Sequence, residues 1–179
     1  MPSRTSRSVA LLTLALFAAA CTRTTLQGSA AQEHGGEDDF ARMDFWDAIS
    51  TDRAVSNTDA VHALSLHYGL PAPGDDATRL KMARDRGWMP EKASWEGNTT
   101  ARVGFVARAI CVESGIRGGL TMRLVGTRER YAVNELNYRG WLPGMSPEQA
   151  LSGLQLIALL SKAEDAASGG PDVPREKFQ

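Results

Sequence analysis

The sequence has few of the residues that build covalent cross-links or metal sites. It contains 2 cysteines and 3 histidines among 179 residues. Modification of Cys21 would leave Cys111 as the only thiol, so that no internal disulfide could form. Cys111 lies on the apolar face of a predicted helix, where cysteine ordinarily acts as a small buried hydrophobic residue. His62 and His67 do not have the i,i+4 spacing of a helical metal-binding pair. We therefore predict no disulfide, no metal site and no cofactor.

Sequence motifs for catalysis are also missing. Ser152 lies in Leu-Ser-Gly-Leu-Gln, which lacks the Gly-x-Ser-x-Gly frame of a nucleophilic serine. The glycines of Gly118–Gly126 are not followed by the Lys-Ser/Thr and helix of a phosphate-binding loop. Asp75 and Asp76 lie in a Pro/Gly-rich loop, which is typical of solvated carboxylates. We expect that the protein is not an enzyme, and an uncharacterised hydrolase is the lesser alternative.

No apolar run is long enough to cross a bilayer. The longest, Val9–Ala20, has 12 residues, whereas a transmembrane helix needs about 20. Arg4 and Arg7 precede this run, and its last residues, Ala18–Ala20, are small and stand directly before Cys21. A charged start, a short apolar run and small residues are typical of a secretory signal peptide, which would cover residues 1–20.

The small residues before Cys21 resemble the lipobox of bacterial lipoproteins, with Ala in place of the usual leading Leu. This resemblance implies that Cys21 is the lipidation site, with several acyl chains such as palmitate, which together give stable membrane anchoring. The alternative is an ordinary signal peptide cut at the same place. Thr22 is not the Asp that marks inner-membrane lipoproteins in some bacteria, so the resemblance favours a lipid anchor in the outer membrane of the cell envelope.

Small and polar residues flank the central part of the chain. Residues 21–39 would form the lipidated Cys and a flexible tether, and residues 166–179 a disordered tail, because neither has apolar periodicity. The intervening residues 40–165 suffice for one domain with its own core.

A short motif, Arg-Gly-Trp-apolar-Pro, occurs at Arg86–Pro90 and again at Arg139–Pro143. Helix-forming residues precede each copy, so each glycine fits the left-handed position just past a helix end. Proline then prevents the helix from resuming, and the tryptophan can fold back as a buried plug. The residues predicted to be structural in this way are Gly87, Trp88, Gly140 and Trp141.

A capped apolar helix follows each copy, with Thr99 and Ser152 as the predicted N-caps. A degenerate copy at the start of the domain has a second helix capped by Thr58. Because one such unit cannot bury its apolar face alone, the repetition predicts units that pack together. The predicted fold is mainly α, with three helix–loop–helix units at about residues 40–70, 79–116 and 130–165.

Between the second and third units, Leu120, Met122 and Leu124 alternate with other residues between Gly119 and Gly126. Alternation between two glycines is typical of an extended segment. We therefore predict one short strand near residues 119–126.

The rhythm of three such units, each with a glycine opening its loop, resembles the S-layer homology (SLH) domain over about Asp44–Asp165. The resemblance implies a pseudo-threefold helical domain whose grooves bind pyruvylated cell-wall polysaccharide or a peptidoglycan-linked polymer. The family's Thr-Arg-Ala-Glu signature stands at the start of each second helix. Here those positions contain Ser56–Ala60, Asn98–Arg102 and Leu151–Gln155, none of which supplies the Arg-Ala-Glu set. The resemblance therefore favours the SLH-like fold more than the family's ligand.

Charge is distributed unevenly along the chain. Thr22–Thr78 has 3 basic and 10 acidic residues, whereas Arg79–Arg139 has 12 basic and 6 acidic residues. A basic segment in an acidic chain is typical of an anionic partner, but it can equally pair with the acidic flank of its own domain.

Two functional hypotheses follow, and neither involves nucleic acid. In the first, the protein binds an anionic cell-wall polymer or peptidoglycan through Arg102, Arg117 and Trp95. Trp95 is the tryptophan whose ring we expect to be the most exposed. Arg102 is placed near a helix N-terminus, which also favours an anion. In the second, the protein is a scaffold that docks another envelope protein without glycan recognition. A groove that gathers the three site residues would favour the first hypothesis, and an exposed apolar patch near Gly118–Gly126 would favour the second.

Overall fold

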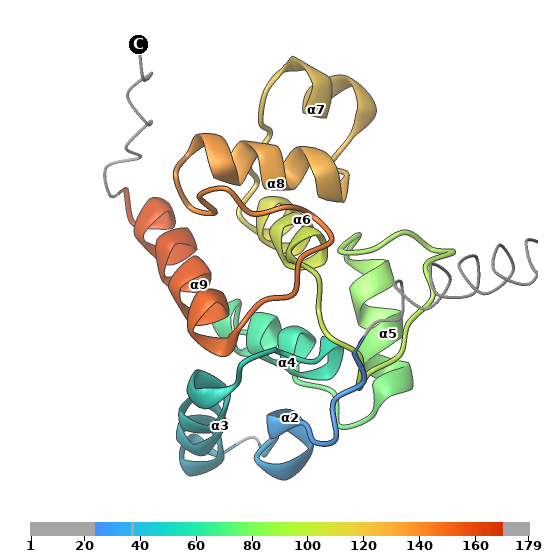
Figure 1. The fold of residues 1–179 in the computed structure, drawn as a ribbon, viewed down its shortest axis with the longest axis vertical. Coiled ribbons are helices and arrows are strands. Elements are labelled where there is room, and N and C mark those ends of the chain that lie inside the picture. The colour runs from blue at the N-terminus through green and yellow to red at the C-terminus, as the bar shows by residue number, and fades with distance from the viewer. Residues whose placement is uncertain (1–23, 37, 170–179) are drawn as a thin grey trace, which may run out of the picture.

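The computed structural model describes residues 24–36 and 38–169. Within these ranges the chain forms eight helices and no sheet, which confirms the predicted mainly α fold (Figure 1). None of these helices is long and apolar enough to cross a membrane. The predicted signal peptide, Cys21 and the residues from 170 onward lie outside the described ranges. The helices are α2 (Ala30–Glu33), α3 (Asp39–Thr51), α4 (Asn57–His67), α5 (Asp76–Asp85), α6 (Val103–Glu113), α7 (Leu120–Val125), α8 (Glu129–Tyr138) and α9 (Gly153–Ala167).

Six of these helices form the repeated frame, as the pairs α3–α4, α5–α6 and α8–α9. An extended residue precedes each second helix, namely Ser56, Arg102 and Ser152. Antiparallel bridges join Ser56 to Thr100 and Arg102 to Ala150. The third side is closed where Val55 N donates to Leu151 O at 2.8 Å. Each unit is therefore bonded to both others through the segment that starts its second helix.

The predicted N-caps are only partly correct. Ser152 caps α9, as predicted, and it forms a reciprocal capping box with Gln155. The predictions for Thr58 and Thr99 are wrong, because Ser56 caps α4 and Arg102 precedes α6 without a side-chain cap bond. Ser56 was missed because Thr58, two residues later, is an equally good capping residue type.

The doubled motif forms two equivalent helix stops. Gly87 and Gly140 both have φ of 74°. Trp88 N donates to Ala83 O and Trp141 N donates to Leu136 O, each at 2.8 Å, which is the long-range bond of a Schellman motif. This confirms the predicted role of the two glycines.

The two tryptophans are buried to different extents. Trp88 is fully buried, and its Nε1 donates to Glu113 Oε1 at 2.6 Å. Arg86 also donates to both oxygens of Glu113, at 2.7 and 2.6 Å, and this bonding holds the pKa of Glu113 below its usual value. Trp141 is half-buried against the core. Both rings pack inward, as predicted, but Trp88 is the more tightly held.

The predicted strand near residues 119–126 is wrong, because this segment forms helix α7. An isolated extended segment would leave its backbone groups without partners, whereas a helical turn pairs them internally. Leu120 and Leu124, which alternate with polar residues in the sequence, lie one helical turn apart.

The predicted flexible tether is wrong for residues 24–36. Leu26 N donates to Asn98 O at 2.8 Å, and Thr100 N donates to Thr24 O at 3.1 Å. Ala30 and Ala31 of α2 are buried in the core. The rest of the domain supplies hydrogen-bond partners for the backbone of this segment and a buried carboxylate that accepts hydrogen bonds from it. The polar composition of the segment itself gives no sign of these contacts. The tail also begins later than predicted, since α9 extends to Ala167.

Candidate functional site

Helix α7 is an addition to the repeated frame. It lies in the connection between α6 and α8, whereas the corresponding connection from α4 to α5 contains no helix. Figure 1 shows α7 at one end of the molecule, beyond α8. Met122 is its only buried residue. Because the frame is already complete without α7, this helix is the natural place for a function that the repeats do not provide.

The outer side of α7 is apolar. Leu120 and Leu124 are 73% and 77% exposed, and Val125 is 44% exposed. Few large hydrophobic side chains are exposed in the described part of the chain, and three of them fall on this six-residue helix. An apolar cluster of this kind is typical of an interaction site.

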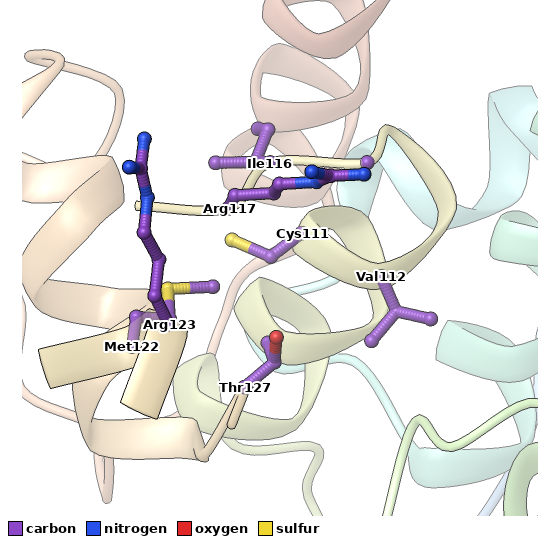
Figure 2. Close-up of a pocket in the computed structure, with 8 residues that line it drawn as sticks. Cys111, Val112, Ile116, Arg117, Met122, Arg123 and Thr127 are labelled. Carbon is purple, nitrogen blue, oxygen red and sulfur yellow. The ribbon is translucent and has the colours of Figure 1, made fainter. Parts of the chain in front are cut away.

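A pocket of about 640 Å³ opens between the C-terminal end of α6 and α7. Figure 2 shows the side chains of Arg117 and Arg123 extending in different directions, with the Sγ atom of Cys111 between them. Its lining includes apolar side chains and both arginines, without any carboxylate. The lining residues are Cys111, Val112, Gly115, Ile116, Arg117, Met122, Arg123 and Thr127.

The positive charges of the two pocket arginines are not paired with carboxylates in the part of the chain that the structure describes. Arg117 and Arg123 are exposed, and their side chains form no ion pair or hydrogen bond with any residue in the described ranges. Arg86 and Arg102, by contrast, are bonded to carboxylates. We call Arg117, Leu120, Arg123, Leu124 and Val125, together with the pocket, the α7 surface.

Cys111 does not supply a reactive thiolate to this pocket. It is 1% exposed, and burial raises the pKa of its thiol to about 12. Since the thiolate is the nucleophilic form, a thiol with this pKa is inert near neutral pH. Over the described residues, no group of three or more His, Cys, Asp or Glu could hold a metal ion. The chemistry that the pocket offers is apolar contact and two positive charges.

The three predicted ligand-binding residues do not form one site. Arg102 precedes α6 and Arg117 follows it, and an 11-residue helix separates them by about 16 Å. Trp95 is half-buried and packs edge-on against Phe105, with ring centroids 6.0 Å apart. Of the three, only Arg117 lines the α6–α7 pocket.

Arg102 also differs in role from the prediction. Its NH1 donates to both oxygens of Glu148, at 3.1 and 3.0 Å, and its NH2 donates to Glu129 at 3.1 Å. With two carboxylates bound, Arg102 joins the second unit to the third and is not a free anion-binding cation.

Sequence reasoning named an apolar patch near Gly118–Gly126 as a sign of protein docking, but it did not single out Leu120, Arg123 and Leu124 as site residues. Their signal was present, because the two leucines are spaced i,i+4 with an arginine between them. The interpretation of the segment as a strand concealed it.

No protein-family model matches this chain, and neither a curated protein nor a solved structure matches it. The chemistry of the α7 surface is therefore the basis for the functional proposal.

Proposed function

We propose that this chain is a non-catalytic, lipid-anchored envelope protein that docks another protein through the α7 surface. The observation that carries this proposal is the exposure of Leu120 and Leu124 beside an apolar pocket. Burying exposed apolar area contributes about 25 cal/mol per Å². A partner that covers these side chains therefore supplies a driving force that the free protein lacks.

The charges of the α7 surface define the chemistry of the partner. Arg117 and Arg123 flank the apolar pocket and have no carboxylate among the residues that line it. Complementary charge favours encounter and fixes the orientation of a complex. The partner is therefore a segment that presents acidic side chains around apolar ones, with one apolar side chain seated in the pocket.

An anionic wall polymer is the second candidate, and the unpaired Arg117 and Arg123 are the observation in its favour. Such a polymer would use these charges, but it would leave Leu120 and Leu124 uncovered. The remaining predicted wall-binding residues contribute little, since Arg102 is bonded to Glu129 and Glu148. The SLH-like repetition of the three units supports the helical fold that this proposal assumes, but it does not support a glycan ligand.

The proposed location is the cell envelope, with a lipid anchor at Cys21 and the outer membrane favoured over the inner. The basis for this is the signal-like segment before Cys21 and the residue that follows it. A partner protein would then be another component of the same envelope.

Two double variants test the docking proposal, Leu120→Ser with Leu124→Ser and Arg117→Glu with Arg123→Glu. We expect both to abolish recovery of the partner protein after chemical cross-linking in cells. All four side chains are exposed, so each substitution should change the free energy of unfolding by no more than about 0.5 kcal/mol. Recovery is measured by quantitative mass spectrometry and folding by circular dichroism.

Matched controls are available on the same chain. Leu154→Ser replaces an exposed leucine on α9, and Arg53→Glu with Lys92→Glu makes the same charge change at exposed positions outside the α7 surface. Both controls should leave recovery unchanged. Binding to isolated sacculi that is lost only in the arginine variant, with no protein captured, would contradict protein docking and favour the wall polymer.

A further inference from the structure

The N-terminal segment 24–33, which we call the strap, is part of the domain. It crosses the junction of the first two units, with an antiparallel bridge between Thr25 and Thr99. Two backbone hydrogen bonds fix this end of the strap, from Leu26 N to Asn98 O at 2.8 Å and from Thr100 N to Thr24 O at 3.1 Å. The strap therefore begins as an added extended segment along the residues that precede α6.

Asp59 holds the other end of the strap. Its Oδ1 accepts from Ser29 Oγ at 2.6 Å and from Ala31 N at 2.8 Å, while its Oδ2 accepts from Ser56 Oγ at 2.6 Å. Asp59 is 1% exposed. A buried polar group left without its partner costs about 1–3 kcal/mol, and a charged one costs more. Detachment of the strap would break two of these bonds and expose Ala30 as well, so the seated strap is strongly favoured.

The seated strap leaves little chain between the domain and the anchor. Thr24 is exposed at the surface of the domain, and three residue steps separate it from Cys21. Three fully extended residues span at most about 11 Å. We infer that the strap holds the domain directly against the membrane, with the strap and the loop Trp95–Thr100 facing the phospholipid headgroups. This inference rests on the lipid anchor of the proposed function.

The face around Thr24 suits a headgroup layer without a specific lipid. Its exposed side chains are polar and mostly uncharged, as in Thr25, Gln27 and Asn98, and Glu96 is also exposed. Because the described residues of this face include no cluster of basic side chains, attraction of these residues to anionic lipid does not hold it in place. The short chain between Thr24 and the lipid anchor holds this face against the membrane. Zwitterionic and anionic phospholipid surfaces should therefore be contacted equally.

Cysteine labelling of the anchored protein tests this inference. The acylated full chain carries either Asn98→Cys or Ser161→Cys and is reconstituted in phosphatidylethanolamine–phosphatidylglycerol vesicles. Both positions are exposed, and Figure 1 shows α9, which carries Ser161, at the left of the molecule, apart from the blue segment that precedes α2. Cys111 is buried and does not compete for the reagent. We expect a bulky polyethylene glycol maleimide to react several-fold more slowly at position 98 than at position 161.

Two controls separate this inference from the anchor itself. In the soluble Cys21→Ser chain, both positions should react at similar rates. A flexible Gly-Ser insertion of twelve residues between Thr22 and Arg23 has a reach of about 20 Å, so it should restore reaction at position 98 in the anchored chain.

The outcomes are distinguishable. If the mature N-terminal peptide has no acyl mass, the lipid anchor of the proposed function fails. If the chain is acylated but position 98 reacts as fast as position 161, the membrane contact is refuted while the anchor stands. Protection at position 98 that survives the Gly-Ser insertion would also overturn the inference, because a short anchor would not be its cause.

Discussion

Trp88→Ala is expected to lower the free energy of unfolding by about 3–5 kcal/mol, the usual loss for truncating a fully buried tryptophan. The ring of Trp88 has no exposed surface, and its Nε1 donates to Glu113. Its removal leaves a cavity and withdraws one hydrogen bond from that carboxylate. Chemical denaturation followed by circular dichroism at 222 nm measures the loss without relying on tryptophan fluorescence.

Trp141→Ala is the matched control, because Trp141 occupies the same position of the other helix stop. Its ring is half-buried, so less apolar area and a smaller cavity are involved. We expect a loss in the same direction that is clearly smaller than that of Trp88→Ala. Equal losses, or no measurable loss at Trp141, would contradict the view that both rings plug equivalent turns with different burial.

Acidification from pH 6.5 to pH 4 is expected to lower the free energy of unfolding through His62. Its pKa is lowered from 6.5 to about 4, first by burial and then by the nearby charge of Arg79, while Asp59 acts in the opposite direction. Its two ring nitrogens have no hydrogen-bond partner, and Phe45 packs against the ring with centroids 4.6 Å apart. The fold therefore holds the imidazole neutral.

The sign follows from proton binding. Between pH 6.5 and pH 4 the unfolded chain binds a proton at His62 and the folded chain does not, so stability falls as the pH falls. The full loss is about 3 kcal/mol, at 1.36 kcal/mol per pKa unit. Below the folded pKa both states are protonated, and this residue adds no further loss.

His62→Leu isolates the contribution of this histidine. The variant cannot titrate and keeps an apolar side chain beside Phe45, so its stability should fall less between pH 6.5 and pH 5 than that of the wild type. His67 and the carboxylates titrate in both proteins, so the difference between the two curves reports His62. Parallel curves would show that His62 is not held neutral in the folded state.

The frame of the fold could be predicted from the sequence because its signals are local. The Gly-Trp pair at a helix end depends on a few adjacent residues, and both glycines adopt the predicted left-handed conformation. Capping was predicted less well, since Ser56 and Thr58 are equally good candidates and tertiary bonds decide between them. The alternating pattern around Leu120 was also ambiguous, because its apolar residues fit both a short strand and a helical turn.

The strap could not be predicted, and the site was predicted only in part, because burial and charge pairing depend on distant residues. Ser29 and Ala31 are ordered by Asp59, which lies about 30 positions away. Arg102 had the expected position near a helix start, but its two carboxylate partners come from the third unit. Sequence alone gives the presence of a charge and not whether another part of the chain neutralises it.

Site-specific photo-cross-linking in cells tests the docking function most directly. A photoreactive amino acid replaces Leu124 on the α7 surface, or Leu154 on α9 as a control site of similar exposure (77% and 65%). We predict one dominant protein adduct from position 124, absent from position 154 and lost when Arg117→Glu and Arg123→Glu are added. The absence of a protein adduct at position 124, or the same adduct at position 154, would contradict the proposal that the α7 surface docks a partner protein.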